Sequence, residues 1–282
     1  MPELPEVETI MRRLRDGTPE SAPVPGEIIE SANVYWPKIV EQPDAKQFKA
    51  DLQKKVVTGV QRRGKFIHFP LSKGHLIVHL RMSGDMRMER RTGGDGKPLA
   101  KENFDQVVVN FQSDWRMVLS SIRKFSRVWY VLDPQTVLGK LGPEPLGPDL
   151  DAQKLYQMLQ SRHRQIKPLL MDQTFIAGLG NIYADEILFT ARIHPLRISD
   201  SITQDEAKAL YQAMQTVLTQ AIEKLGSSLD WMYRGGEFQN YFKVHQREGE
   251  PCPGCGCTVK KITVGQRSTY FCPCCQKLPQ SK

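Results

Sequence analysis

The hydrophobic positions of this chain follow a helical spacing first and a β spacing afterwards. The first apolar residues recur at i, i+3, i+4 and i+7, at Val7, Ile10, Met11 and Leu14. This spacing predicts a short amphipathic helix that anchors the amino terminus to a core. From Ile28 to about Val131, short runs rich in Val, Ile and Phe are separated by Gly, Ser, Asp or Lys. We expect strands at residues 54–60, 65–70, 75–80, 106–111, 117–120 and 127–131.

A segment rich in proline and glycine follows the β region. Residues 134–150 hold four prolines and three glycines, which is typical of a linker between domains. Beyond it the spacing becomes helical again, around Leu155, from about Pro168 and over 182–191. A long helix then opens with the capping box Thr203–Glu206 and carries an apolar stripe that indicates structural core. It ends at residue 226, and a loop over 227–246 follows it.

These patterns predict an α+β protein, because several short strands at close spacing are typical of a sandwich or barrel. The expected parts are an N-terminal β-sandwich domain with its helix (1–133), the linker (134–150), a helical domain (151–246) and a cysteine-rich finger (247–282). No run approaches the roughly 20 apolar residues of a membrane-spanning helix. The acidic, proline-interrupted start is unlike a signal peptide. We therefore expect a cytosolic protein without a membrane partner.

Charge points to the class of partner. The net charge is +8 and the isoelectric point about 9.2, which favours a polyanion. Residues 241–282 hold seven Lys or Arg against two Glu. The basic excess is therefore concentrated in the carboxy-terminal segment.

All six cysteines lie in that same segment, which indicates a metal site in a reducing cytosol. Two C-x2-C pairs, sixteen residues apart, supply four thiolates: Cys252, Cys255, Cys272 and Cys275. This spacing predicts one tetrahedral Zn²⁺, and four thiolates leave no position for water, so the zinc is expected to be structural. Cys257 or Cys274 could replace a neighbouring ligand.

The residues between the cysteine pairs predict a zinc-ribbon hairpin. Two strands, 260–264 and 268–271, are expected around Gly265-Gln266-Arg267, with Arg267 at the tip. A solvated tip is the ordinary interpretation of such an arginine, and a nucleic-acid contact is the alternative.

The amino terminus carries a candidate nucleophile. If Met1 is removed, Pro2 offers a secondary α-amine, and α-amines titrate at about 7.7 to 8.0. A usable fraction is therefore unprotonated near neutral pH. Glu3 places a carboxyl group beside it. The competing interpretation is a simple helix cap, because proline suits a first helical turn.

Three further stretches have a weaker chemical signal. The Gly178-Leu179-Gly180-Asn181 turn enters a helix and could hold a phosphate on free N–H groups. Residues 62–65 form a basic hairpin, for which solvated charge is the default. The tripeptide 123–125 pairs cations with an aromatic ring, an arrangement able to read or wedge base pairs.

Five stretches, in order along nearly the whole chain, resemble the formamidopyrimidine-DNA glycosylase family. They are residues 2–9 (PELPEVET), 79–84 (HLRMSG), 141–146 (LGPEPL), 166–184 (from IKP to GNIYA) and the four-cysteine ribbon. Each motif alone is modest, but five in register are specific. The resemblance implies a β-sandwich domain, a helix-two-turn-helix domain and a zinc ribbon.

The resemblance also implies catalytic roles. Pro2 attacks C1′ of the damaged nucleotide, expels the base and forms an iminium with the sugar. Glu3 protonates the deoxyribose ring oxygen, and Glu6 supports the site. Lys65 contacts the phosphate beside the lesion, and Arg267 grips the lesion's phosphates and assists elimination.

The remaining implied roles are contacts with double-stranded DNA. Met82 fills the space left by the everted nucleotide, Arg123 hydrogen-bonds the orphaned base, and Phe125 wedges the stack. Lys167 and Asn181 are the phosphate contacts of the helix-two-turn-helix element. We expect a monomer, acting on damaged DNA in the bacterial nucleoid.

The chain departs from the family pattern at three places. Ser121 stands where an aspartate is common, and Ser126 stands where a glycine is usual. The loop 230–246 looks shorter than the family segment that covers an everted 8-oxoguanine. This difference bears on which lesion is preferred and not on catalysis.

Four functions are compatible with these features. The first is a bifunctional glycosylase and abasic-site lyase for oxidised purines (8-oxoguanine, formamidopyrimidines), nicking by β,δ-elimination. The short loop keeps an endonuclease VIII-like enzyme for oxidised pyrimidines as the runner-up, against which Arg123 and Phe125 argue as a cytosine-reading pair. A non-catalytic DNA-binding module would be expected to lack Pro2 or Glu3, and both are present. A zinc-ribbon protein that binds RNA or protein partners would explain the carboxy-terminal segment but would give Pro2 and Glu3 no function.

Overall fold

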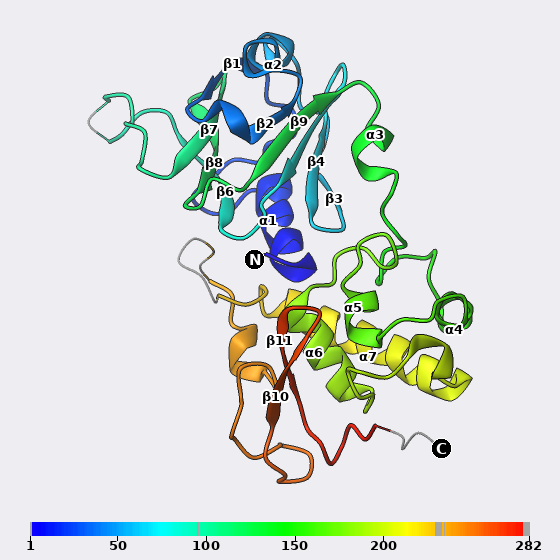
Figure 1. Ribbon diagram of the computed structural model, residues 1–282. Helices are drawn as coiled ribbons and strands as arrows, with labels where there is room; N and C mark the ends of the chain where they lie inside the picture. Colours follow the sequence, from blue (N-terminus) through cyan, green and yellow to red (C-terminus); the bar gives the residue numbers. More distant parts are fainter. Residues whose placement is uncertain (1, 95, 229–232, 234, 279–282) are drawn as a thin grey trace. The chain divides into compact units, whose positions relative to one another are not determined.

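The computed structural model describes residues 2–94, 96–228, 233 and 235–278, which divide into two compact units. One unit comprises Met1–Lys140 with Ser228–Gly236, and the other comprises Leu141–Ser227 with Glu237–Lys282. The first holds the two large sheets, and the second holds most of the helices and the β10–β11 hairpin (Figure 1). The predicted α+β class is confirmed.

Helix α1 (Leu4–Asp16) opens the first unit and confirms the first prediction. Glu3 is its N-cap and Pro5 lies in its first turn, where a missing N–H loses no helical bond. The stripe from Val7 to Leu14 is buried. Gly17, at φ 77°, ends the helix in a backbone conformation that favours glycine.

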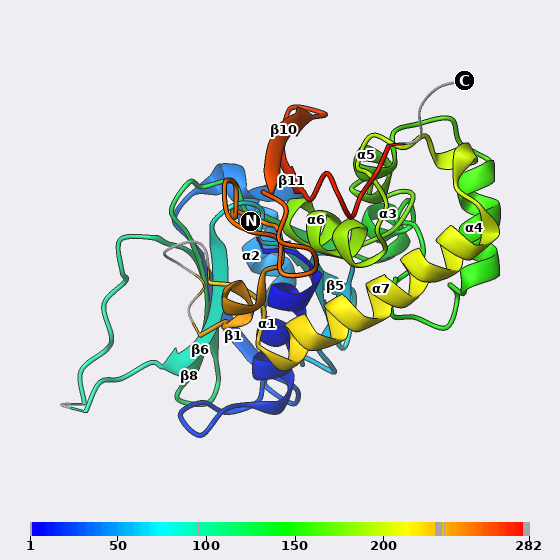
Figure 2. The same ribbon diagram turned by 90° about the horizontal axis from the view of Figure 1, so that it is seen from below.

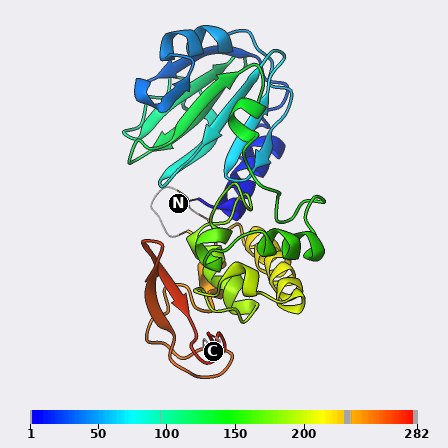
Figure 3. The ribbon, with the colours of Figure 1, turned by 45° about the vertical axis from the view of Figure 1, so that its right-hand side comes forward.

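Two sheets form the predicted β-sandwich (Figure 3). Apolar side chains from both sheets and from α1 share one buried core. All strand pairs are antiparallel except β2 with β9. The four-stranded sheet has the order β1 (Ile29–Val34), β7 (Asp105–Phe111), β8 (Trp115–Ser121), β6 (Gly84–Arg90). The five-stranded sheet has the order β2 (Val40–Gln42), β9 (Arg127–Val131), β5 (His75–His79), β4 (Phe66–Pro70), β3 (Gln61–Arg63).

The structure differs from the predicted elements of this unit at several places. Residues 54–60 form only isolated bridges, through Val56 and Val57. Strands β1, β2, β3 and β6 were not predicted. Strand β6 alternates buried methionines with more exposed charged residues, but it holds no β-branched or aromatic residue, so its composition does not favour a strand. Helix α2 (Ala45–Leu52) was also not predicted, because only Phe48 and Leu52 of it are buried. A one-turn helix η1 (Pro37–Ile39) precedes β2, and α3 (Gln135–Leu138) lies within the predicted linker.

The second unit is built on α7 (Gln204–Glu223), which begins at the predicted capping box of Thr203 and Glu206. It contacts α4 (Ala152–Gln160) and α6 (Asn181–Thr190), and Figure 2 shows α7 passing beside α4. The remaining elements are α5 (Ile166–Leu170), η2 (Ser199–Ser201), η3 (Phe238–Tyr241), β10 (Lys260–Val264) and β11 (Arg267–Phe271). None of the described helices combines the length and apolar character needed to span a bilayer.

The ribbon hairpin turns more tightly than predicted. Val264 pairs with Arg267, so the turn consists of Gly265 and Gln266 alone, at φ 54° and 60°. Two residues at positive φ are typical of a two-residue hairpin turn. Arg267 is therefore the first residue of β11, and its position in the ladder fixes its backbone.

Candidate functional site

Two buried carboxyl groups lie at the amino terminus beside Pro2. Pro2 is buried, and Glu3 and Glu6 are each 2% exposed. The backbone N–H of Glu3 donates a hydrogen bond of 2.8 Å to Oε2 of Glu6. The first turn of α1 also offers the positive end of the helix dipole to both carboxyl groups. Glu3 is thus a helix cap and, in the same place, a carboxyl neighbour of Pro2.

The β3–β4 hairpin, which carries Lys65, packs against α1. Arg62 donates to Glu8 of α1 at 2.7 Å, and Arg12 donates to the same carboxylate at 2.8 Å. Burial alone would raise the pKa of Glu8, but the hydrogen bonds and charges of Arg62 and Arg12 lower it. Lys65 follows the turn at Gly64 and is 4% exposed. The ion pair between Arg62 and Glu8 therefore fixes the hairpin of Lys65 onto α1, the helix that Glu3 caps.

The three residues predicted to enter the duplex lie on two neighbouring loops. Nη1 of Arg123 is 3.9 Å from Sδ of Met82, and the backbone N–H of Arg123 donates to Oγ of Ser83 at 3.2 Å. Met82 is 38% exposed and Phe125 is 49% exposed. Large apolar side chains left this exposed mark interaction sites when they gather. Residues 41 positions apart in sequence therefore present one exposed group.

Ser126, which stands where the family usually has a glycine, holds the two loops together. Oγ of Ser126 donates to the carbonyl of Leu80 at 2.8 Å, so Ser126 links the loops. A Cβ on Gly84 would lie 2.4 Å from that carbonyl and 2.4 Å from the Ser126 hydroxyl, so no side chain fits there. Nη1 of Arg127 donates to the carbonyls of residues 124–126. Ser121 is fully buried, with an Oγ that has no partner among the described residues.

His79 is a residue of this region that the sequence reasoning missed. It is buried at the end of β5, and its Nδ1 accepts the backbone N–H of Arg81 at 3.0 Å. Burial, followed by the charges of Arg81 and Lys65, lowers the pKa of His79 to about 3. A neutral imidazole thus supports the turn before Met82. The sequence feature that could have identified His79 is its position at the end of an apolar strand, directly before that turn.

Only part of the loop 230–246 belongs to the described residues, since 229–232 and 234 lie outside them. Tyr233 is 2% exposed, and the guanidinium of Arg13 lies 5.8 Å from its ring centroid. Burial raises the pKa of Tyr233 to about 12. This tyrosine therefore anchors its loop on α1, and the predicted shortness of the loop stays a prediction.

In the second unit, two predicted phosphate contacts meet on strand β11. Nδ2 of Asn181 donates to the carbonyl of Ser268 at 3.0 Å, and Nζ of Lys167 donates to the same carbonyl at 3.1 Å. Nζ of Lys167 also donates to Oγ1 of Thr269 at 2.8 Å and lies 2.7 Å from Oδ1 of Asp185. Lys167 is 0% exposed. Its ammonium group holds the strand of Arg267 in place, and its contact with a phosphate stays a prediction.

Arg267 is exposed and lines a cavity whose other lining residues are both polar and apolar. The cavity has a volume of about 260 Å³ and lies between the residues of α5 and the hairpin turn. Arg164 and Asp172, which pair at 2.8 Å, line its far side. Because Asp172 balances the charge of Arg164, Arg267 is the lining residue that could offer its guanidinium to an anion.

A second group of buried residues missed by the sequence reasoning fixes the segment that precedes the cysteines. The carboxylate of Glu186 accepts backbone N–H bonds of 2.8, 3.0 and 2.8 Å from residues 243–245. Nδ1 of His245 lies 2.8 Å from Oδ2 of Asp185. Burial raises the pKa of Glu186, although the three N–H groups oppose the rise. Adjacent acidic residues on an apolar helix were the available signal.

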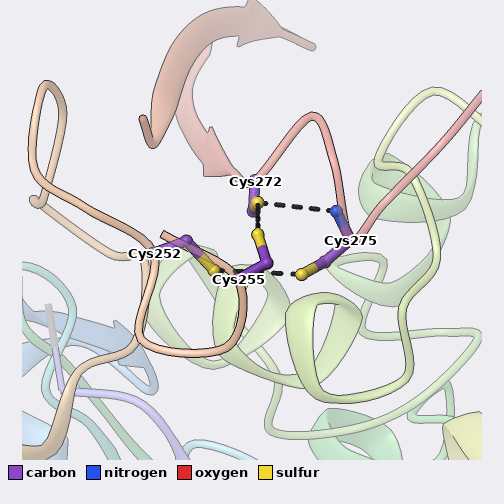
Figure 4. Close-up of side chains that lie close together, drawn as sticks. All are labelled: Cys252, Cys255, Cys272 and Cys275. Carbon is purple, nitrogen blue, oxygen red and sulfur yellow. Dashed lines mark hydrogen bonds between the residues drawn. The ribbon is translucent and has the colours of Figure 1, made fainter. Parts of the chain in front are cut away.

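Four cysteine sulfurs converge as the sequence predicts, and one structural zinc is confirmed for this site (Figure 4). All four lie within 4.8 Å of one another, with Cys255–Cys272 at 3.4 Å and Cys252–Cys275 at 3.9 Å. A tetrahedral Zn²⁺ with bonds of about 2.3 Å needs sulfurs about 3.8 Å apart. The sulfur positions therefore fit the metal.

The two extra cysteines are placed beside this group. Cys257 and Cys274 form a disulfide that links the two cysteine pairs. They are therefore paired with each other, while none of the four predicted ligands belongs to a disulfide. The alternative in which one of them replaces a ligand is not the arrangement of this structure.

The sequence matches three family profiles that together span most of the chain. They are described as the formamidopyrimidine-DNA glycosylase N-terminal domain (residues 1–128), the formamidopyrimidine-DNA glycosylase H2TH domain (residues 141–232) and a zinc finger found in FPG and IleRS (residues 249–278). H2TH denotes the helix-two-turn-helix element. The matches fall on the sandwich, on the helical region and on the ribbon.

Similar proteins and structures cover the chain from end to end. A formamidopyrimidine-DNA glycosylase of Pelotomaculum thermopropionicum is 41% identical over 287 residues, covering 99% of this chain and 100% of that protein. One of Enterococcus faecalis is 38% identical over 286 residues, covering 99% and 98%. The structure of Lactococcus lactis Fpg with abasic-site DNA superposes with a TM-score of 0.87 at 33% identity, covering 98% of this chain and 100% of that one. That of MutM with DNA containing carbocyclic 8-oxo-G has a TM-score of 0.87 at 35% identity, with the same coverage.

Proposed function

The chain belongs to the formamidopyrimidine-DNA glycosylase family, and we propose that Pro2, once Met1 has been removed, is its nucleophile. The protein is a DNA glycosylase of base excision repair. The observation that carries the proposal is the placement of a buried Pro2 directly before two buried carboxyl groups, Glu3 and Glu6. An amine in such a site permits covalent capture of the sugar, which an activated water would not.

The proposed reaction begins at C1′ of the damaged nucleotide. The Pro2 nitrogen forms a bond to C1′, the bond from C1′ to the base breaks, and the base leaves with the electron pair and takes up a proton. Glu3 donates a proton to the ring oxygen as the sugar opens, which leaves an iminium between C1′ and Pro2. Glu6 positions Glu3 through the 2.8 Å hydrogen bond to its backbone.

The iminium then permits strand cleavage, so we propose abasic-site lyase activity for the same protein. Loss of a C2′ proton expels the 3′ phosphate by β-elimination, and δ-elimination expels the 5′ phosphate. Lys65 and Arg267 are proposed to hold the phosphates that leave. The lyase steps consume no cofactor, and the zinc supports the ribbon that carries Arg267 without taking part in them.

A nucleotide must leave the stack before Pro2 can reach it, at a cost of a few kcal/mol. Met82, Arg123 and Phe125 are proposed to offset that cost by occupying the gap, bonding the orphaned base and wedging the stack. We propose oxidised purines, 8-oxoguanine and formamidopyrimidines, as the lesions. The solved relatives with carbocyclic 8-oxo-G and with FAPY-dG in their DNA support this choice. The site of action is the bacterial nucleoid, where the chromosomal DNA lies.

Borohydride trapping tests the proposal, because borohydride reduces an iminium to a stable amine. Mature protein should be trapped on duplexes with 8-oxoguanine opposite cytosine, with a formamidopyrimidine and with an abasic site. Absence of an adduct on the abasic duplex would overturn the proposed nucleophile. Faster trapping on an oxidised pyrimidine than on 8-oxoguanine would instead favour the endonuclease VIII-like specificity.

A further inference from the structure

The end of the four-stranded sheet that carries Met82 and Arg123 carries a second exposed group. Strand β8 ends shortly before Arg123, and β6 begins shortly after Met82. Because the sheet is antiparallel, the end of β1 and the start of β7 lie at this same end of the sheet. Tyr35 and Trp36 follow β1, and the backbone N–H of Tyr35 donates to the carbonyl of Gln106 at 2.9 Å. The aromatic pair therefore lies on the sheet end shared with the duplex-entering loops.

Lysines from three separate segments are placed over these two rings. Nζ of Lys101 lies 5.1 Å from the Tyr35 ring centroid, and Nζ of Lys124 lies 4.5 Å from the Trp36 centroid. Nζ of Lys38 lies 5.8 Å from Trp36. We call these five residues the aromatic-lysine patch. Tyr35 is 46% exposed and all three lysines are exposed.

Resting on the proposed function, we propose that the aromatic-lysine patch is a second DNA-binding surface that holds the phosphate backbone of the duplex arm next to the lesion. A lysine over an aromatic face is attracted to the ring, which restricts a flexible side chain and presents its ammonium in a fixed place. The patch thus offers three preplaced cations to a polyanion.

Glu102, which follows Lys101 in the chain, has a side chain that is 73% exposed, so it lowers the positive charge of the patch without cancelling that of three lysines. Glu102 lies 3.6 Å from the guanidinium of Arg87, and the buried Asp105 accepts two bonds from the same arginine. Protein partners are a poorer match, because lysine is depleted at the centre of protein–protein interfaces whereas DNA interfaces are strongly basic. The charge of the patch therefore favours DNA.

The geometry of the sheet gives the place on the duplex. Lys124 lies between Arg123 and Phe125 in the chain, so the patch is continuous with the proposed wedge. Strands β1 and β8 are separated by β7 alone, so their ends lie about 10 Å apart. With a rise of about 3.4 Å per base pair, this places Tyr35 and Lys101 about three base pairs from the orphaned base.

The salt dependence of binding tests the patch with Lys38→Ala/Lys101→Ala. The matched control is Lys46→Ala/Lys49→Ala, which removes two exposed lysines from α2. Binding to a duplex with an abasic-site analogue is measured between 50 and 200 mM salt. Each lost phosphate contact lowers the slope of log K against log salt by about 0.9, so the patch variant should lose about 1.8 and the control less than half as much. Equal slopes in the two double variants would overturn the proposal.

Duplex length gives a second readout that a folding defect would not produce. The affinity gap between wild type and the patch variant should be present with eight base pairs on both sides of the lesion. This affinity gap should vanish when the duplex arm that contacts the patch is shortened to two base pairs, and it should persist when the arm on the other side of the lesion is shortened. A gap independent of both arms would contradict the patch. Borohydride trapping on an abasic duplex at low salt distinguishes failure of the patch from failure of the proposed nucleophile. A wild type that is not trapped counts against Pro2 as nucleophile, and the salt slopes still test the patch.

Discussion

The backbone N–H of Glu3 donates to Oε2 of Glu6 across the first turn of α1, at 2.8 Å. Both side chains are buried, so the bond is shielded from water. The arrangement gives Glu6 a positioning role for Glu3, beside the nitrogen of Pro2. Two predictions follow from the division of roles between these carboxyl groups.

A substitution of Glu6 should displace Glu3 only if it removes the oxygen that accepts the Glu3 N–H. Glu6→Gln retains a carbonyl oxygen for the Glu3 N–H, whereas Glu6→Ala removes it and costs about 1 kcal/mol. If that loss falls on the transition state, base excision slows about five- to tenfold in Glu6→Ala and much less in Glu6→Gln. Single-turnover excision rates measure the difference. Equal defects in the two variants would show that Glu6 acts through its charge instead.

Replacing Glu3 should separate the two activities. Glu3→Gln removes the acid that opens the sugar, so excision of a damaged base should fall by about 10²- to 10⁴-fold. An abasic site already exposes an aldehyde, and Pro2 can condense with it without that acid. Borohydride trapping on an abasic duplex should therefore persist in Glu3→Gln. Loss of both activities, in a variant with unchanged melting temperature, would be evidence against the assigned role.

The buried His79 predicts a loss of stability in acid. Its pKa is lowered to about 3 by burial and by Arg81 and Lys65, whereas an unfolded histidine titrates near 6.5. The unfolded chain therefore binds a proton that the folded chain refuses, so this stability is present above pH 6.5 and lost toward pH 3. Between pH 6.5 and 5 the loss is about 2 kcal/mol.

Urea unfolding of wild type and His79→Asn at pH 7 and pH 5 checks this prediction. Asparagine keeps an acceptor for the N–H of Arg81 but does not titrate, so the acid-induced loss should be about 2 kcal/mol smaller in the variant. His68, whose pKa burial and the neighbouring His75 lower to about 4, contributes equally to both proteins. The same loss in both would rule out His79 as the source.

The six cysteines should divide into two classes by metal content. Cys252→Ser removes a ligand, so the protein should lose most of its zinc and, with it, the hairpin that presents Arg267. Cys257→Ser/Cys274→Ser removes the disulfide pair and should keep one zinc per chain. Elemental analysis after gel filtration gives the counts, and DNA affinity should fall in the first variant alone. Zinc loss in the double variant would place one of its cysteines in the ligand set.

The sequence predicted best those features that depend on local spacing. The stripe from Val7 to Leu14 and the two C-x2-C pairs each lie within one short segment, so periodicity was sufficient to find helix α1 and the zinc ligands. Strand β6 alternates as a half-buried strand should, but it was missed because its methionines and charged residues include no β-branched or aromatic side chain. Helix α2 was missed because two buried residues give too short a signal.

Contacts between distant segments were beyond such reasoning. The approach of Met82 to Arg123 requires the pairing of β6 with β8, which no local pattern specifies. Lys167 was assigned from a motif as a phosphate contact, whereas it is buried against Asp185 and against Thr269 of β11, which lies 102 positions further along the chain. The motif identified the residue, and tertiary structure decided what its ammonium touches.

The location of the trapped sugar tests directly whether Pro2 is the nucleophile. Mature protein is reduced with borohydride on an abasic duplex, digested and mapped by mass spectrometry, beside a form with one extra residue ahead of Pro2, in which the Pro2 nitrogen is an amide. We expect the sugar on the nitrogen of Pro2 in the mature protein and no adduct in the extended form. An adduct on a lysine peptide, or equal trapping of the extended form, would contradict this expectation.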